Sequence, residues 1–285
     1  MPEIAIAQPV AAPRGRARPW NRFLIIGCCV LAVFMVLAIF GAWIAPYDPD
    51  SQDLMALLQP PTAAHWFGTD QIGRDILSRI IVGTRITLTV ALVPVALAGV
   101  AGVALGLVAG YFGGVVDRVL TACIDLLLTI PNLILAIAMV TAIGANLTGL
   151  TAAISISSTP PLARLVRSRV QELREEDYIA AAISVGMRQR RVLWRHVLPN
   201  AVSLIVIQLS LLAGQAVLVA SALGFLGLGV QPPAPEWGAM LGDSREYIQV
   251  APHVVLAPGI AIALLVFAFN MLGDGLRDRF DPNQT

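Results

Sequence analysis

Long apolar runs alternate with polar connections along this chain. Most of the runs are close to the ~20 residues that a helix needs to cross the hydrocarbon core of a membrane. They cover Phe23–Ala45, Ile86–Ala109, Val119–Ile143, Leu147–Leu165, Ala201–Leu223 and Val254–Leu272. The fourth run is the least regular, because it is rich in Ser and Thr and Pro160-Pro161 interrupts its end. The pattern predicts an all-α polytopic membrane protein with six transmembrane helices.

The basic residues, all 19 of them arginine, are distributed unevenly between the two sides that six spans define. Four fall on one side, namely Arg74, Arg79, Arg85 and Arg245, and the other 15 share a side with both termini. Arginine and lysine concentrate in cytoplasmic loops. We therefore expect both termini and the segment Arg164–His196 to face the cytoplasm, and the loops Pro46–Thr84 and Gly224–His253 to face outward.

Composition excludes several kinds of chemistry. The net charge of +1 gives no strong field for nucleic acid. Without lysine the chain has neither the phosphate-binding lysine of a P-loop nor an amine for a Schiff base. His65, His196 and His253 are far apart and have no zinc-site spacing. The three cysteines lie in apolar runs and are predicted to be packed thiols: Cys28, Cys29 and Cys123.

Eight arginines crowd the segment between Arg164 and Arg195. One arginine at mid-membrane costs about 2.5–3.5 kcal/mol, so eight would cost on the order of 20 kcal/mol or more. The segment is therefore predicted to be a cytoplasmic loop. It is longer than a connection between helices requires, which indicates a function of its own.

A short helix is predicted inside this segment. Acidic residues at 175–177 favour a helix start, Tyr178–Val185 contains good helix formers with small side chains, and Gly186 ends the helix. A second helical run, Gln189–Val197, is closed by Leu198-Pro199, where the next span begins. The short helix could dock into a groove on a cytoplasmic partner or rest on lipid headgroups, and the residues favour these two alternatives equally.

Four glycines spaced by four lie on one predicted helix face: Gly102, Gly106, Gly110 and Gly114. This spacing repeats the GxxxG pattern that lets membrane helices approach closely. It predicts a tight helix contact, within this subunit or with a paired one.

Asp125 lies inside the third apolar run. An ionisable side chain at membrane depth is a functional candidate, and Asp125 could line a translocation path or contact a peptide ammonium group. The alternative is a structural hydrogen bond or a position shallow enough to reach water. Pro131 removes one backbone hydrogen bond and is expected to bend the helix, and Asn132 beside it is a second candidate for the path.

Polar residues also mark the two outward loops. Asp70, Arg74 and Asp75 are predicted to form a solvated turn with local ion pairs. The proline-rich stretch Gln231–Trp237 is predicted to be a stiff extended link, with Trp237 as an anchor at the membrane interface.

The alanine run, Gly186 and Leu198-Pro199 together resemble the EAA loop of bacterial ABC importer permeases. The chain departs from that motif at one point, since Ala180 stands where the motif has glutamate. In that family the loop forms a coupling helix that docks on an ATPase subunit. The resemblance implies a coupling role for seven residues: Tyr178, Ala180, Ala181, Ala182, Gly186, Leu198 and Pro199.

Three more segments narrow the resemblance. HWFGTDQIGRDILSR (65–79), GFLGLGVQPPAPEWGAML (224–241) and AFNMLGDGLRDRFDP (268–282) are similar to the peptide and nickel importer subgroup, and most similar to the C-type permease of dipeptide and oligopeptide systems. The resemblance covers nearly the whole chain after the first 20 residues or so.

The resemblance implies a type I ABC importer permease fold in the bacterial inner or plasma membrane, in contact with membrane lipid. The implied partners are a homologous second permease, one or two ATPase subunits, an external solute-binding protein and a peptide substrate. The chain itself would be no enzyme and bind no cofactor, while the ATPase subunits use ATP and Mg²⁺.

The expected organisation has four parts: a cytoplasmic arm at 1–22, a first transmembrane helix with an outward loop at 23–83, a permease core at 84–273 with the coupling loop 164–199, and a cytoplasmic tail at 274–285. Nickel, haem or glutathione are alternative substrates of such machinery. A stand-alone secondary transporter would show a paired inverted repeat, and no convincing repeat is present. An intramembrane enzyme would need a catalytic pair or metal cluster at membrane depth, where Asp125 stands alone, and a membrane scaffold would show no substrate-dependent effect.

Overall fold

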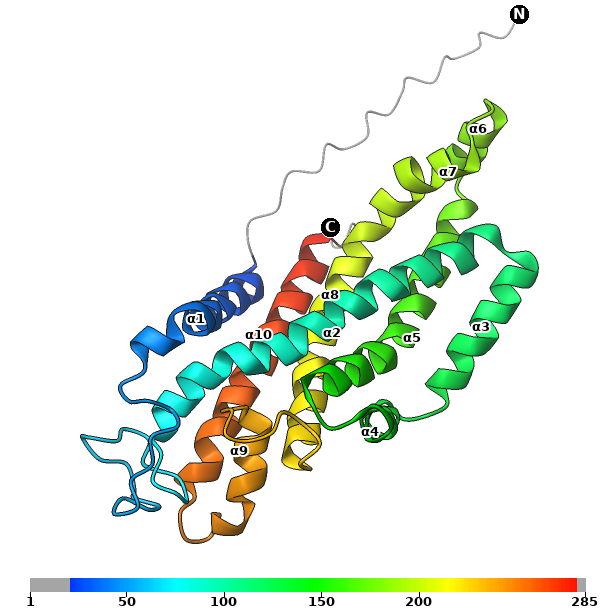
Figure 1. Ribbon diagram of the computed structural model, residues 1–285. Coiled ribbons are helices and arrows are strands. Elements are labelled where there is room, and N and C mark those ends of the chain that lie inside the picture. Colours follow the sequence, from blue (N-terminus) through cyan, green and yellow to red (C-terminus); the bar gives the residue numbers. More distant parts are fainter. Residues whose placement is uncertain (1–20, 281–285) are drawn as a thin grey trace, which may run out of the picture.

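The computed structural model describes residues 21–280, and their regular structure is helical apart from one isolated β-bridge between Thr69 and Asp75 (Figure 1). The remainder of the predicted arm and the last five residues of the predicted tail lie outside the described residues. The helices are α1 (Arg22–Ile44), α2 (Ile76–Phe112), α3 (Gly114–Leu128), α4 (Asn132–Ile143), α5 (Leu147–Arg174), α6 (Asp177–Ser184), α7 (Gln189–Val192), a π-helical turn (Leu193–Val197), α8 (Leu198–Phe225), α9 (Trp237–Ser244), a 3₁₀ turn (Arg245–Tyr247) and α10 (His253–Phe280).

The long helices run between two ends of the molecule (Figure 1). One end, here called the arginine-rich end, holds the start of α1, the link from α2 to α3, the segment from the end of α5 to α7, and the end of α10. The opposite loop end holds residues 45–75 and 226–252. A hydrogen bond between the side chains of Asn21 and Asp278 ties the start of α1 to the end of α10.

Helix α2 lies at the centre and packs on α5, α8 and α1. Its contact with α5 is built on small residues. A Cβ atom added to Gly106 would lie 2.6 Å from the Val166 Cβ and 2.7 Å from the Ala163 carbonyl oxygen. A Cβ on Gly110 would lie 2.9 Å from the Val170 Cβ, and one on Gly102 would lie 3.1 Å from Leu162. The glycine face therefore meets a helix of the same chain.

Gly114 does not belong to this face. Helix α2 ends at Phe112, and Gly114 begins α3 with a φ of +60°. A Cβ at Gly114 would meet nothing within 4 Å. The spacing by four continues in the sequence across a helix end, where the 3.6-residue period no longer applies.

The count of six spans is not confirmed. Within residues 21–280, four helices are long and apolar enough to cross a membrane: α1, α2, the continuous helix Gln189–Phe225, and α10. The expected third span is broken into α3 and α4, which are bent by 92°, and it makes a fifth only if the pair counts as one span. Pro131 explains the break, because it lacks an N–H and disfavours helical geometry at the residue before it.

The fourth apolar run forms a longer helix than predicted, and this helix is not among those apolar enough to span a membrane. Helix α5 continues through Pro160-Pro161 to Arg174. The two prolines do not end it, because Leu162, Val166 and Val170 beyond them are buried against the core. Its Ser, Thr and Arg content keeps it outside the set of apolar spans.

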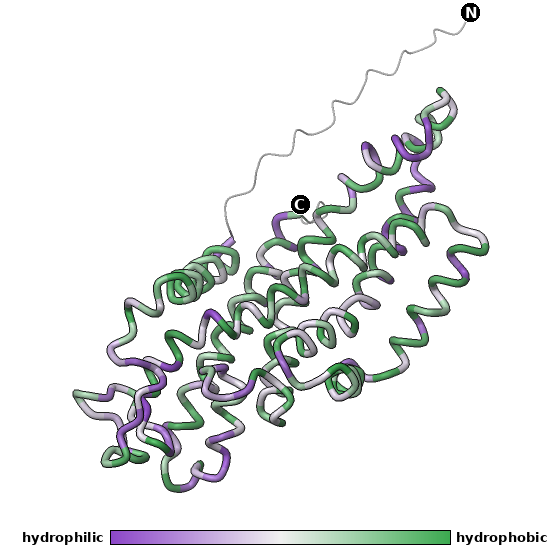
Figure 2. Tube along the Cα trace, in the orientation of Figure 1, coloured by the Kyte–Doolittle hydropathy of each residue, from purple (hydrophilic) through white to green (hydrophobic). Residues whose placement is uncertain are grey.

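Apolar residues run along the outer helices, including α1, as well as along the central ones (Figure 2). Helix α1 exposes most of its apolar side chains, including Val33, Ile39 and Trp43. Such a surface suits lipid rather than water. Two of the three free cysteines, Cys29 and Cys123, are exposed on it, so the expectation of packed thiols is wrong for them.

Candidate functional site

Helix α6 forms a tip at the arginine-rich end (Figure 1). Ile179 anchors it, being 1% exposed. Ala180 and Ala181 are exposed, and Ala182 is half-buried. The apolar side chains of Tyr178, Ile183 and Val185 are also exposed, Val185 at 80%. The helix thus presents small and apolar groups outward, the kind of surface that a partner covers.

The end of α6 is fixed by a Schellman motif. The Gly186 N–H donates to the Ile183 carbonyl at 2.9 Å, and the Met187 N–H donates to the Ala182 carbonyl at 3.2 Å. Gly186 has a φ of +81°, which side chains other than glycine rarely adopt. A Cβ there would meet nothing within 4 Å, so the requirement for glycine is conformational and not one of space.

The segment after α6 is one continuous helix from Gln189 to Phe225. The expectation that Leu198-Pro199 closes the arginine-rich run is wrong. Half-buried Leu198 and exposed Pro199 lie in the first turn of α8, directly after the π-helical turn. A π-helical turn changes the hydrogen-bond spacing, which accommodates a proline that has no N–H to donate.

The cytoplasmic loop expected over Arg164–His196 is correspondingly shorter. Residues 164–174 belong to α5, and residues 189–197 belong to the continuous helix. The part that links these two long helices is residues 175–188, which contains α6. Two long helices thus hold the exposed tip at its two ends.

Ion pairs connect α3 to α5. The Arg167 guanidinium donates to Asp117, with 2.7 Å between Nη2 and Oδ2. Asp125 pairs with Arg164, and both side chains are about half exposed, at 47% and 57%. Asp125 is therefore already paired within the chain. Asn132 begins α4, and its Oδ1 atom is buried with no hydrogen-bond partner among residues 21–280.

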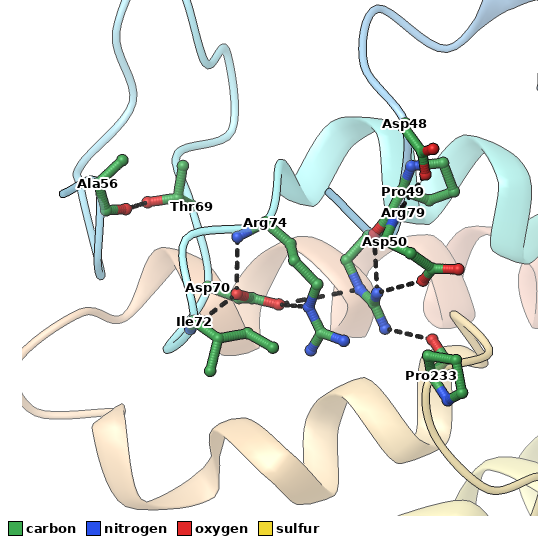
Figure 3. A network of polar contacts seen from close by, with 10 residues as sticks. All are labelled: Asp48, Pro49, Asp50, Ala56, Thr69, Asp70, Ile72, Arg74, Arg79 and Pro233. Atoms are coloured by element: carbon green, nitrogen blue, oxygen red, sulfur yellow. Dashed lines mark hydrogen bonds and ion pairs between the residues drawn. The ribbon is translucent and has the colours of Figure 1, made fainter. Parts of the chain in front are cut away.

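A second polar network lies at the loop end (Figure 3). The Asp70 carboxylate accepts from Arg74 Nε at 2.6 Å and from the Arg74 N–H at 2.9 Å. Arg79 donates to the Pro49 carbonyl at 2.9 Å and to the Pro233 carbonyl at 3.3 Å. The network thus fastens the loop after α1 to the loop after α8.

The expectation of a solvated turn at this position is wrong. Asp70, Arg74 and Asp75 are at most 5% exposed. Asp75 caps α2 by accepting from the Ser78 N–H at 2.8 Å, and its other oxygen lies 2.9 Å from His65 Nδ1. The predicted ion pair between Asp70 and Arg74 exists, but it is buried rather than solvated.

The proline-rich link ends in two buried residues. Glu236 is fully buried and caps α9, because its two oxygens accept from the N–H groups of Gly238 and Ala239 at 2.9 and 2.8 Å. Burial raises the pKa of Glu236 to about 7, and the two backbone hydrogen bonds oppose the shift. Trp237 is also fully buried, with its Nε1 donating to the Ile80 carbonyl at 3.1 Å. It is therefore a core residue and not an interfacial anchor.

Among the described residues, no three His, Cys, Asp or Glu side chains are placed to hold a metal ion. Fold and site together define a multi-pass helical membrane protein with an exposed, largely apolar helix at one end.

Comparisons with known proteins identify the class. The family model for the inner membrane component of binding-protein-dependent transport systems matches residues 102–285, and a model for the N-terminal transmembrane domain of oligopeptide transport permease C matches residues 21–61. The chain belongs to this family of transport-system membrane components.

Named relatives cover most of the chain. A dipeptide transport system permease protein of Alkalihalophilus pseudofirmus is 46% identical, over 92% of this chain and 86% of the relative. Glutathione transport system permease proteins of Pectobacterium atrosepticum and Escherichia coli are 44% and 41% identical, over 92% and 97% of this chain and 89% and 94% of the relatives. A solved structure of the MetNI methionine ABC transporter matches with a TM-score of 0.59 at 19% identity, over 72% of this chain and 98% of that one. It shares the fold.

Sequence reasoning missed two of the networks that tie the helices together. The sequence places Arg164 and Arg167 in a loop, and no local pattern indicates their pairing with acids on α3. For Glu236 the sequence offers one signal, since an acidic side chain at a helix start is favoured by the helix dipole.

Proposed function

We propose that this chain is the C-type permease subunit of an ABC importer for dipeptides or short oligopeptides in a bacterial inner or plasma membrane. The observation that supports this most is the exposed α6 tip, which two long helices hold at its two ends. Its position and its Schellman end suit a coupling helix seated in a groove of an ATPase subunit. The arginine-rich end then faces the cytoplasm.

The proposed assembly contains a homologous second permease, one or two ATPase subunits and an external solute-binding protein. The ATPase subunits bind and use ATP and Mg²⁺, and this chain binds neither. Closure of the ATPases moves α6, and the attached helices α5 and α8 change access to a path between the two permeases. Asp125 and Asn132 are candidates for the wall of that path.

The family and the named relatives support the substrate class. The relative at 46% identity is named for dipeptides, and those at 44% and 41% are named for glutathione, itself a short peptide. Competition between a labelled dipeptide and glutathione in the same uptake assay separates these two substrates. If neither substrate is taken up, the assignment to peptides is contradicted.

The coupling role is tested with Ala181→Glu in the reconstituted complex. A carboxylate on the exposed apolar face must be desolvated on docking, so we expect peptide uptake to fall about tenfold or more, the effect of about 1.4 kcal/mol. ATPase binding is measured in parallel by co-purification.

The matched control is Ala63→Glu, the same change at an exposed position in the loop end. We expect it to keep uptake within about twofold, as distant surface changes usually do. Normal uptake and normal ATPase binding with Ala181→Glu would contradict the docking proposal. Ion-driven uptake by the isolated chain would instead support a secondary transporter.

A further inference from the structure

A groove of about 420 Å³ lies between α1 and α2 toward the loop end. Its lining residues are Met35, Ala38, Ile39, Arg85, Leu88, Thr89, Leu92 and Val93. Buried Leu88 forms the floor, while Met35, Ile39 and Val93 are exposed along the rim. The volume falls in the range of pockets that bind small organic ligands.

The groove has one charged side chain, and that charge has no counterpart. Arg85 is exposed and makes no ion pair or side-chain hydrogen bond with any of residues 21–280, and neither α1 nor α2 contains an acidic residue. Arg79 on the same helix differs, because it is buried and paired with Asp50 and Asp70. Thr89 is the other polar lining residue, and its hydroxyl donates a hydrogen bond to the Arg85 carbonyl at 2.7 Å.

The position of Arg85 along the helices suits a headgroup. Gly41, near the end of α1, packs on Ile81, and Arg85 follows one turn, about 6 Å, further along α2. Helical side chains lean toward the start of their helix, so Arg85 leans toward the loop end, where exposed Trp43 marks the membrane interface. A long cationic side chain at this depth reaches the polar layer.

We propose that this groove binds one phospholipid, with its phosphate on the Arg85 guanidinium and an acyl chain along the apolar lining. An unpaired arginine at the interface end of an apolar groove matches the two halves of a phospholipid. The exposed apolar surface of α1 around the groove indicates a lipid-facing perimeter, which favours lipid over a protein helix as the occupant.

Native mass spectrometry of the purified full chain measures the binding. The three probes are phosphatidylglycerol, diacylglycerol with the same acyl chains, and glycerol phosphate. The first has both halves of the ligand, the second lacks the phosphate and the third lacks the chains. We expect the wild type to retain phosphatidylglycerol at least tenfold more strongly than either of the others.

Two groove variants and one control locate the site. We expect Arg85→Gln to weaken phosphatidylglycerol binding about tenfold, the loss of one charge-assisted contact of about 1.4 kcal/mol. Ala38→Phe fills the groove and should weaken it as well, while leaving the charge in place. Arg245→Gln removes an exposed arginine at the same end but outside the groove, and should leave binding unchanged.

Several results would overturn the proposal. If Arg85→Gln binds phosphatidylglycerol as strongly as the wild type, the proposed phosphate contact is contradicted. If Ala38→Phe does so, the proposed acyl-chain contact is contradicted. Binding of glycerol phosphate alone would indicate a free-anion site. Cross-linking of a cysteine placed at Ile39 to the second permease in the assembled complex would show that protein, and not lipid, covers the groove.

Discussion

Gly106 allows α2 and α5 to approach as closely as they do. A methyl group there would lie under 3 Å from both the Val166 side chain and the Ala163 carbonyl oxygen, and a backbone oxygen cannot rotate away. The helices would have to separate. The contact lies in the centre of the bundle, between the two helices that pack most extensively on each other.

We expect Gly106→Ala to lower the free energy of unfolding by about 1–3 kcal/mol, as overpacking does. The measurement is the thermal midpoint in detergent. Gly259→Ala is the control, because a Cβ there has its nearest neighbour, the Leu241 Cδ2, at 3.9 Å. It should be neutral or slightly stabilising, since alanine favours helix. Equal midpoints for both variants would mean that α2 and α5 separate at no cost.

Glu236 makes stability depend on pH. Its pKa rises from 4.5 in its ordinary state to about 7 in the fold, so the stabilisation is complete below pH 4.5 and is lost as the pH rises through 7. The full effect is about 3 kcal/mol at most. We expect the thermal midpoint of the wild type to fall between pH 5 and pH 8, and the fall to be smaller in Glu236→Gln.

The exposed Glu246→Gln variant is the control for that slope. It should keep the wild-type dependence on pH. If Glu236→Gln shows the wild-type slope as well, another group is responsible.

Among the elements, those defined by local chemistry could be predicted from sequence. The helix after Asp177 and its end at Gly186 follow from residue types within one turn, and the structure has both. The apolar stretches of α1, α2, α8 and α10 follow from hydropathy alone. These signals are local, and packing elsewhere does not reverse them.

The elements that were mispredicted depend on distant contacts. Pro160-Pro161 indicates a helix end from sequence alone. Burial of the next two turns against α2 nevertheless keeps α5 continuous. Trp237 reads as an interfacial residue, but the Ile80 carbonyl, 157 positions earlier, accepts its N–H. No local pattern contains either partner.

The pair Asp125–Arg164 joins two elements, and its role can be separated from a role in transport. Asp125→Asn removes the charge and the ion pair together. The reversal Asp125→Arg with Arg164→Asp keeps the pair and moves the charges. If the pair is structural, we expect the single change to lower peptide uptake several-fold and the reversal to restore it to within about twofold, as coupled contacts do.

Failure of the reversal to restore uptake, with the complex intact, would assign Asp125 to the translocation path. Normal uptake by Asp125→Asn would exclude both roles of the charge. Co-purification of the partner subunits distinguishes loss of assembly from loss of transport in each variant.

For the whole molecule, the distribution of arginine predicts the orientation. Single cysteines at Ala63 and Ser184 lie at opposite ends and are exposed, after Cys28, Cys29 and Cys123 are replaced by alanine. We expect a membrane-impermeant maleimide to label the cysteine at 63 in intact bacteria and the one at 184 only after permeabilisation. The reverse result would place the α6 tip outside and contradict the coupling proposal.

The continuous helix from Gln189 to Phe225 runs from the arginine-rich end to the loop end of the molecule (Figure 1). Its 37 residues extend about 55 Å. At the far end of this helix, Gly224 leaves no room for a side chain beside the Glu236 carboxylate. The start of α9 therefore packs directly against the helix. Under the coupling proposal, we expect a displacement at the α6 tip to reach the loop end as a tilt or a slide of this one helix. Inserting a flexible glycine pair in the middle of this helix would disconnect the two ends while leaving each of them folded.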